Sequence, residues 1–198
     1  APGPLVLDLV ERGMPVVSTC EELACPWGTP GVARRIDEAA QRAGVAVLGT
    51  GVNPGFVMDA LPLALTAPCR AVHSVRVERV QDASTRRRPF QDKVGVGQDP
   101  AVVQAELDQR RAGHVGLRES AAMVVAKLGL STDSFREEQR VVVADRVAER
   151  SGRRIEAGQA LGVEQVGRAC RGETVVVELV FRATFGEERS WDRVLIEG

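Results

Sequence analysis

The chain of 198 residues lacks the features that mark several large classes of protein. It has no apolar run of the roughly 20 residues needed to cross a bilayer, and no signal-peptide pattern at its start. The 26 lysines and arginines nearly balance the 27 aspartates and glutamates, so the net charge is −1 and no basic field is available for nucleic acid or a membrane surface. We therefore expect a soluble, cytoplasmic protein with neither nucleic acid nor membrane as a partner.

Metal-binding patterns are absent as well. Cys20, Cys25, Cys69 and Cys170 show no C-x-x-C spacing, and the chain has only two histidines. This excludes the common zinc sites. We expect no metal ion, and reduced thiols in a reducing compartment.

The dinucleotide-binding fingerprint Gly-x-Gly-x-x-Gly does not occur. Gly49, Gly51 and Gly55 come near it, but their spacing is one residue too long. The chain also begins without Met and leads through Pro2 and Pro4 directly into an apolar helix whose partner strand would precede it. We therefore expect that an amino-terminal part carrying the fingerprint is missing, and that the carboxyl-terminal continuation is missing too.

The most informative stretch covers residues 45–59. A short apolar run at 45–48 predicts a strand covered on both faces, and the glycines after it allow a ligand or a second backbone to approach closely. Asn53 is suited to cap a following helix, with Pro54 at its first position. This is half of a βαβ unit, and ligands bind at the carboxyl end of such strands. A plain tight turn without a ligand explains the glycines equally well.

The first third of the chain predicts further parallel α/β structure. Helices are expected at 5–12 and 32–43, and a strand at 15–19 precedes Glu21. Because the carboxyl ends of parallel strands share one edge, Glu21 and Asn53 should face one cleft. Glu21 could be a general base, a helix-entry charge or an ordinary exposed residue, whereas helix entry alone explains Glu22.

The pattern changes after about residue 69. Alternating polar and apolar residues predict strands at 73–80, 141–147, 163–169, 174–185 and 191–196, with helices at 100–111 and 120–128. The chain is thus predicted to be of the α/β class. A truncated Rossmann-type parallel sheet at 1–66 is followed by an α+β domain at 67–198 with an antiparallel sheet that has helices on one face.

Five segments, in order along the chain, resemble the motifs of one enzyme family. They are residues 18–27 (STCEELACPW), 48–59 (LGTGVNPGFVMD), 79–84 (RVQDAS), 94–97 (VGVG) and 113–120 (GHVGLRES). Together they are similar to the 2,4-diaminopentanoate dehydrogenase family, a branch of the dihydrodipicolinate-reductase-like oxidoreductases that includes native amine dehydrogenases. Five collinear motifs are far more specific than any one of them.

This resemblance implies an enzyme with a Rossmann domain that binds NAD or NADP, a substrate domain built on an antiparallel sheet, and a homodimer. The implied reaction is the reversible oxidative deamination of an amine or diamino acid, or the reductive amination of a ketone with ammonia, by hydride transfer. Glu21 resembles the family's catalytic glutamate. A carboxylate can hold ammonium or an iminium by charge-assisted hydrogen bonds and can move protons.

Other site residues are carried over from the same motifs. The resemblance assigns substrate contacts to Asn53, Arg79, Gln81 and His114. Gln81 stands where the family often has the shorter asparagine, which leaves the substrate's chain length open. Cofactor contacts are assigned to Thr19, Gly51, Asn53 and Pro54. Without the resemblance, Arg79 reads as an exposed strand residue and His114 as a structural histidine in a glycine-flanked loop.

Two other functions compete with this interpretation. A dihydrodipicolinate reductase proper should show a basic motif with histidine and lysine, and no such cluster is present. A non-catalytic dimerisation or ligand-binding module would keep the sheet without the chemistry.

We predict that the isolated chain binds NAD(P) poorly and turns over little or nothing, because it lacks the fingerprint. Measurable ammonia-dependent NADPH oxidation by the isolated chain would contradict this.

Overall fold

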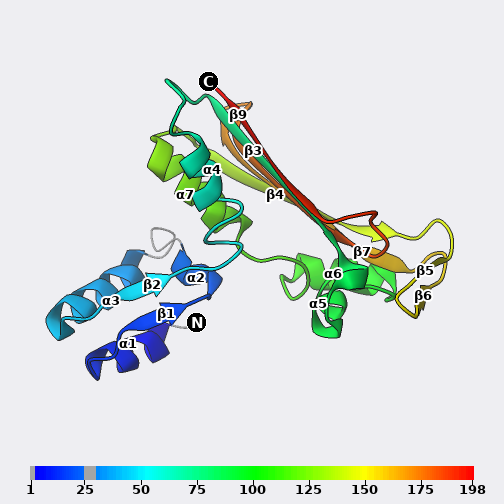
Figure 1. Cartoon of the computed structure of the whole chain (residues 1–198), viewed down its shortest axis with the longest axis horizontal. Helices are drawn as coiled ribbons and strands as arrows, with labels where there is room; N and C mark the ends of the chain where they lie inside the picture. Colours follow the sequence, from blue (N-terminus) through cyan, green and yellow to red (C-terminus); the bar gives the residue numbers. More distant parts are fainter. Residues whose placement is uncertain (1–2, 25–29) are drawn as a thin grey trace.

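The structure is a computed structural model that describes residues 3–24 and 30–198, and its elements form two groups (Figure 1). The first group is a parallel strand pair with helices, as predicted. Its elements are α1 (Gly3–Glu11), β1 (Val16–Ser18), α2 (Glu21–Ala24), α3 (Pro30–Ala43) and β2 (Val47–Gly49). Strands β1 and β2 are paired in parallel, with Val17 opposite Leu48. A small core between α1, α3 and the strands contains Val10 and Ile36.

One face of this strand pair is open, which differs from the predicted strand covered on both sides. Val16 and Val47 pack against the small core, while Val17 and Leu48 point to the other face and are 72% and 55% exposed.

The turn after β2 differs from the predicted cap. Helix α4 (Ala60–Leu65) begins later than expected, and Asp59 rather than Asn53 caps it, accepting from the amide of Ala60 at 2.6 Å. The same carboxylate accepts from the amide of Gly55 at 2.8 Å, so it closes the preceding turns and delays the helix. The second backbone that approaches the glycines belongs to α2, because a β-carbon on Gly49 would lie 1.9 Å from its Leu23 carbonyl oxygen.

The second group is built on a five-stranded sheet in the order β4-β7-β8-β3-β9. Its strands are β3 (Ser74–Asp82), β4 (Ser134–Val143), β7 (Ala160–Arg171), β8 (Thr174–Thr184) and β9 (Trp191–Glu197), and a hairpin of β5 (Ala148–Arg150) and β6 (Arg153–Ile155) extends from them. The predicted antiparallel sheet is confirmed except that β3 and β8 are parallel. The alternation of polar and apolar residues cannot predict the direction of this pair, because β3 and β8 are far apart in the sequence.

Helices cover one face of this sheet, as predicted (Figure 1). They are α4, α5 (Arg88–Lys93), α6 (Pro100–Asp108) and α7 (Leu117–Leu128), and a short 3₁₀ turn, η2 (Ala83–Thr85), follows β3. Helix α5 falls between the predicted strand at 73–80 and the predicted helix at 100–111, where no element was expected. Helix α7 begins three residues earlier than expected, and β4 begins seven residues before the expected position 141. Among the described residues, no helix is long and apolar enough to cross a membrane.

The two groups have separate cores. The larger one lies between the sheet and its helices and includes Leu107, Val124 and Leu179, which are fully buried. It also includes Val57 and Met58, so the turn after β2 packs with the second group. The division of the chain into domains at 1–66 and 67–198 stays a prediction.

Candidate active site

Glu21 and the Asn53–Pro54 turn meet at the start of α7. Glu21 is the first residue of α2, shortly after β1, and the turn follows β2. A β-carbon built on Gly116, the residue before α7, would lie 2.5 Å from Cδ of Pro54 and 3.6 Å from Cγ of Glu21. The two segments that were expected to share a sheet edge therefore flank one glycine.

Asn53 offers an unsatisfied acceptor at this place. Its peptide bond to Pro54 is cis, and its Nδ2 lies 2.8 Å from Sδ of Met58. Its Oδ1 is buried and has no hydrogen-bond partner among the described residues. Because an unpaired buried acceptor costs about 1–3 kcal/mol, this oxygen is suited to accept a hydrogen bond from a ligand.

His114 lies in the loop that leads into α7, two residues before Gly116. Its ring contacts that of Phe181 with 4.8 Å between centroids, and its Nε2 is buried without a partner among the described residues. Burial, together with the positive charges of Lys93 and Arg79, lowers the pKa of His114 to about 4. The imidazole is therefore neutral at pH 7 and adds no positive charge to the site.

Gln165 holds the loop of His114 in place. Its Oε1 accepts from the backbone amide of His114 at 2.6 Å, and its Nε2 donates to the carbonyl of the same residue at 3.1 Å. The Gln165 side chain is only 1% exposed. Sequence analysis missed this residue, although a glutamine in phase with the buried Val163 on one strand face was a usable signal.

Arg79 and Gln81 lie further along the same sheet face, on β3. Arg79 stands opposite Phe181 in the β3–β8 register, which places it near His114. Its Nη1 lies 3.1 Å from both carboxylate oxygens of Asp192. Gln81 is buried, and its amide donates to a backbone carbonyl. A substrate carboxylate would therefore have to share Arg79 with Asp192.

The predicted cofactor residues surround the strand ends. The amide of Thr50 donates to the carbonyl of Ser18 at 2.9 Å, which ties the ends of β1 and β2 together. Thr19 is exposed beside this link and Pro54 is buried. Cys25, Trp27 and the side chain of Glu22 lie outside the described residues, while Cys20, Cys69 and Cys170 are free thiols.

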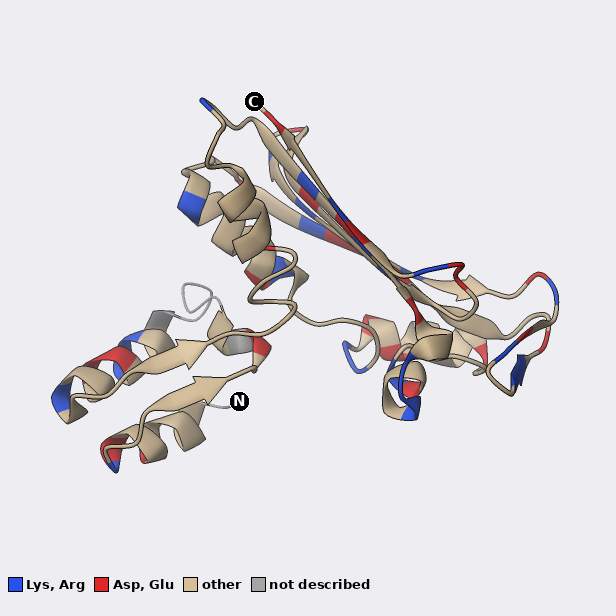
Figure 2. Ribbon diagram, in the orientation of Figure 1, with Lys and Arg blue, Asp and Glu red and all other residues tan. Residues whose placement is uncertain are grey.

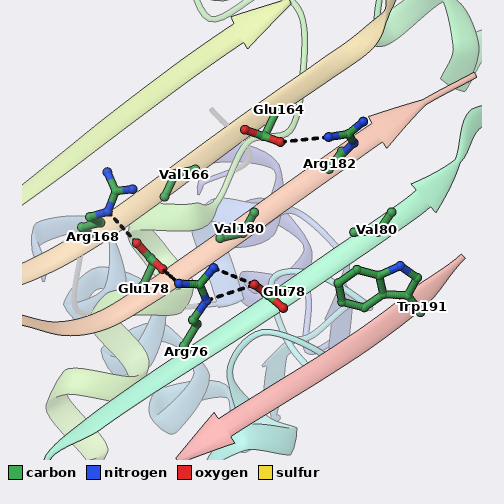
Figure 3. A pocket seen from close by; sticks show the side chains of 10 residues that line it. All are labelled: Arg76, Glu78, Val80, Glu164, Val166, Arg168, Glu178, Val180, Arg182 and Trp191. Carbon is green, nitrogen blue, oxygen red and sulfur yellow. Dashed lines mark hydrogen bonds and ion pairs between the residues drawn. The ribbon is translucent and has the colours of Figure 1, made fainter. Parts of the chain in front are cut away.

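Two hollows in the surface lie away from these predicted site residues. One of about 840 Å³ lies beside α3 and β2, and one of about 360 Å³ lies on the sheet face that no helix covers (Figure 3). The second is lined by three arginines, three glutamates, three valines and Trp191, and Glu178 pairs there with both Arg76 and Arg168 at 2.6 Å. None of the residues predicted for catalysis or binding lines either hollow.

Comparison with known proteins decides the family. Residues 56–185, more than half of the chain, match the sequence model for the C-terminal domain of 2,4-diaminopentanoate dehydrogenase. The chain belongs to this family. The resemblance found in the sequence motifs is thereby confirmed. The matched region includes Arg79, Gln81 and His114 but not Glu21 or Asn53, and the roles of all five residues stay predictions.

One curated protein and two solved structures are similar to this chain. A 2,4-diaminopentanoate dehydrogenase of Acetoanaerobium sticklandii is 37% identical over 123 residues, which cover 61% of this chain and 35% of that protein. The structure of an amine dehydrogenase from Mycobacterium smegmatis has a TM-score of 0.79 at 20% identity, over 100% of this chain and 60% of that one. Biliverdin reductase from Synechocystis, in complex with biliverdin and NADP⁺, has a TM-score of 0.51 at 8% identity, over 99% and 53%. The chain thus spans about a third of the curated relative, and the two structures show a shared fold.

The lowered pKa of His114 predicts a pH effect on stability. Between about pH 6.5 and 4 the unfolded chain binds a proton at this residue that the folded chain does not, so the free energy of unfolding falls as the pH falls through this window. The free energy of unfolding can be measured in urea at pH 7 and at pH 4.5. Its decrease between the two pH values should be smaller in His114→Asn than in the unchanged chain, by up to about 3 kcal/mol. The exposed His73, changed to Asn, is the control. Equal losses in the unchanged chain and in His114→Asn would contradict the prediction.

Proposed function

We propose that this chain is part of an NAD(P)-dependent oxidoreductase that acts on primary amines, by oxidative deamination or, in reverse, by reductive amination of a ketone with ammonia. The observation that carries the proposal is the position of Glu21 beside Pro54 and Gly116, in a chain whose following region belongs to the 2,4-diaminopentanoate dehydrogenase family. The substrates are a small amine or ketone and ammonia.

In this proposal Glu21 carries the proton chemistry. Its carboxylate holds ammonium or the substrate iminium by charge-assisted hydrogen bonds and exchanges a proton as ammonia adds or water leaves. The neutral His114 and the unpaired Oδ1 of Asn53 supply polar contacts that do not repel a cationic substrate. The positive charge of Arg79 is offset by Asp192, so Glu21 sets the charge near the reacting carbon.

The cofactor in this proposal is NAD or NADP, which accepts or donates the hydride when bound. The residues present suit its nicotinamide end, because the exposed Thr19 and the Gly51 turn lie at the carboxyl ends of parallel strands, and Oδ1 of Asn53 is a buried acceptor without a partner among the described residues. The phosphate-binding fingerprint does not occur in these 198 residues. The NADP⁺ in the related Synechocystis structure supports a nicotinamide cofactor.

The test is Glu21→Gln in the protein that carries this chain, assayed for ammonia-dependent oxidation of NADH and NADPH with a panel of small ketones. One acid/base group typically contributes about 10²–10⁴-fold, so kcat should fall by that factor. Glu11→Gln, an exposed glutamate at the end of α1, should leave kcat unchanged. A protein without measurable turnover before and after the Glu21 change would instead favour a non-catalytic binding module.

We also propose that the chain forms a homodimer through the sheet face that no helix covers. Figure 2 shows basic and acidic residues along the strands of this sheet. Around the hollow of Figure 3, three arginines balance three glutamates, and Val80, Val166, Val180 and Trp191 lie among them. A face without excess charge does not repel its own copy, and an apolar patch framed by polar residues is typical of an interface.

A charge in the middle of this face should disrupt the dimer. Val180→Glu places an unpaired carboxylate among paired side chains, and burying it would be unfavourable. Light scattering after gel filtration should then give the mass of a monomer, while Val102→Glu, an exposed valine on α6, should keep the dimer. A monomeric unchanged protein, or a dimeric Val180→Glu variant, would contradict the proposal.

A further inference from the structure

Asp59 joins the Asn53–Pro54 turn to helix α7 through a buried hydrogen bond. Its Oδ2 accepts from the amide of Gly55 at 2.8 Å and from the hydroxyl of Ser120 at 2.7 Å, and its Oδ1 accepts from the amide of Ala60 at 2.6 Å. Both Asp59 and Ser120 are 0% exposed. The bond to Ser120 spans 61 positions of the sequence, so it is a tertiary contact and not a local cap.

This bond lies one helical turn from the candidate active site. Ser120 donates its backbone amide to the carbonyl of Gly116 at 3.0 Å, and Gly116 is the residue against which Pro54 and Glu21 lie. A shift of α7 would therefore change the distances from Gly116 to Pro54 and to Glu21. His114, two residues before Gly116, would move with it.

The two residues differ in what they support. Asp59 caps α4 and closes the turn at Gly55, so its loss would disturb local structure as well as the tertiary contact. The hydroxyl of Ser120 has one role among the described residues, which is to reach Asp59 from α7. Ser120 is therefore the residue whose removal isolates the contact between the turn after β2 and α7.

We propose that Asp59 and Ser120 are a positioning pair for the amine chemistry, and that their hydrogen bond sets the distance between Glu21 and the residues that α7 and its preceding loop contribute. This inference rests on the proposed function. Misplacing a reacting group by about 1 Å can lower the rate about 10²-fold. We therefore expect the bond that fixes the distance between Glu21 and α7 to affect turnover more than folding.

A second serine–aspartate pair in the chain provides a matched control. Ser84 is also buried and donates its hydroxyl to the buried Asp82 at 2.8 Å, but it follows β3, and the hydrogen bonds of its amide and its hydroxyl join it to Asp82 and not to the residues around Gly116. Ser84→Ala and Ser120→Ala therefore each remove a buried hydroxyl that donates to a buried aspartate, over two positions of the sequence for Ser84 and over 61 for Ser120. Each should lower the free energy of unfolding by a similar amount, because each leaves a buried carboxylate with one donor fewer.

The experiment compares the two variants in the protein that carries this chain. We expect Ser120→Ala to lower kcat about 10- to 100-fold with KM for the ketone changed less, and Ser84→Ala to leave both near the unchanged values. Asp59→Ala combined with Ser120→Ala should be little worse than Asp59→Ala alone, because either change removes the hydrogen bond between the two side chains. Equal effects of the two alanine variants on kcat, or additive losses in the double variant, would overturn the proposal.

Hydrogen exchange separates this inference from the proposed function. If the unchanged protein shows no amine chemistry, the proposed function fails, but the positioning role is still readable from amide exchange in peptides covering 51–57 and 113–117. Faster exchange there in Ser120→Ala than in Ser84→Ala supports the role. Identical exchange in the two variants contradicts it.

Discussion

The close contact between Gly116 and Pro54 is the constraint on which the candidate site depends. Any β-carbon at position 116 would lie 2.5 Å from Cδ of the proline, and the backbone φ of 115° is one that favours glycine. This contact brings the start of α7 against the ends of the parallel strands. It therefore places Glu21 and the loop of His114 at one location, although more than 90 residues separate them in the sequence.

The charges near this contact suit a cationic reaction partner. His114 is kept neutral because burial lowers its pKa, and Arg79 is paired with Asp192. In the proposed function the carboxylate of Glu21 acts on ammonium or an iminium, while Lys93 remains a positive charge near His114. The unpaired polar atoms of Asn53 and His114 are neutral, so they can orient a substrate without changing this balance.

Local patterns in the sequence predicted the features that depend on neighbouring residues. The parallel pair, the alternating strands and the meeting of Glu21 with Pro54 all follow from the order of strands and helices. The sequence could not predict the features that depend on contacts between residues far apart in the chain. The parallel direction of β3 and β8, and the bonds of Gln165 to His114 and of Ser120 to Asp59, join segments far apart in the chain. The prediction that Asn53 caps the next helix was wrong, because that helix begins only at Ala60 and Asp59 caps it.

The most direct test of the account is a crystal structure of the protein that carries this chain, with an oxidised nicotinamide cofactor and an amine bound together. The account predicts that the carbon bearing the amine lies beside C4 of the nicotinamide, with the carboxylate of Glu21 within hydrogen-bonding distance of the nitrogen and His114 lining the pocket. An amine bound away from Glu21, for example in the hollow of the uncovered sheet face, would contradict it.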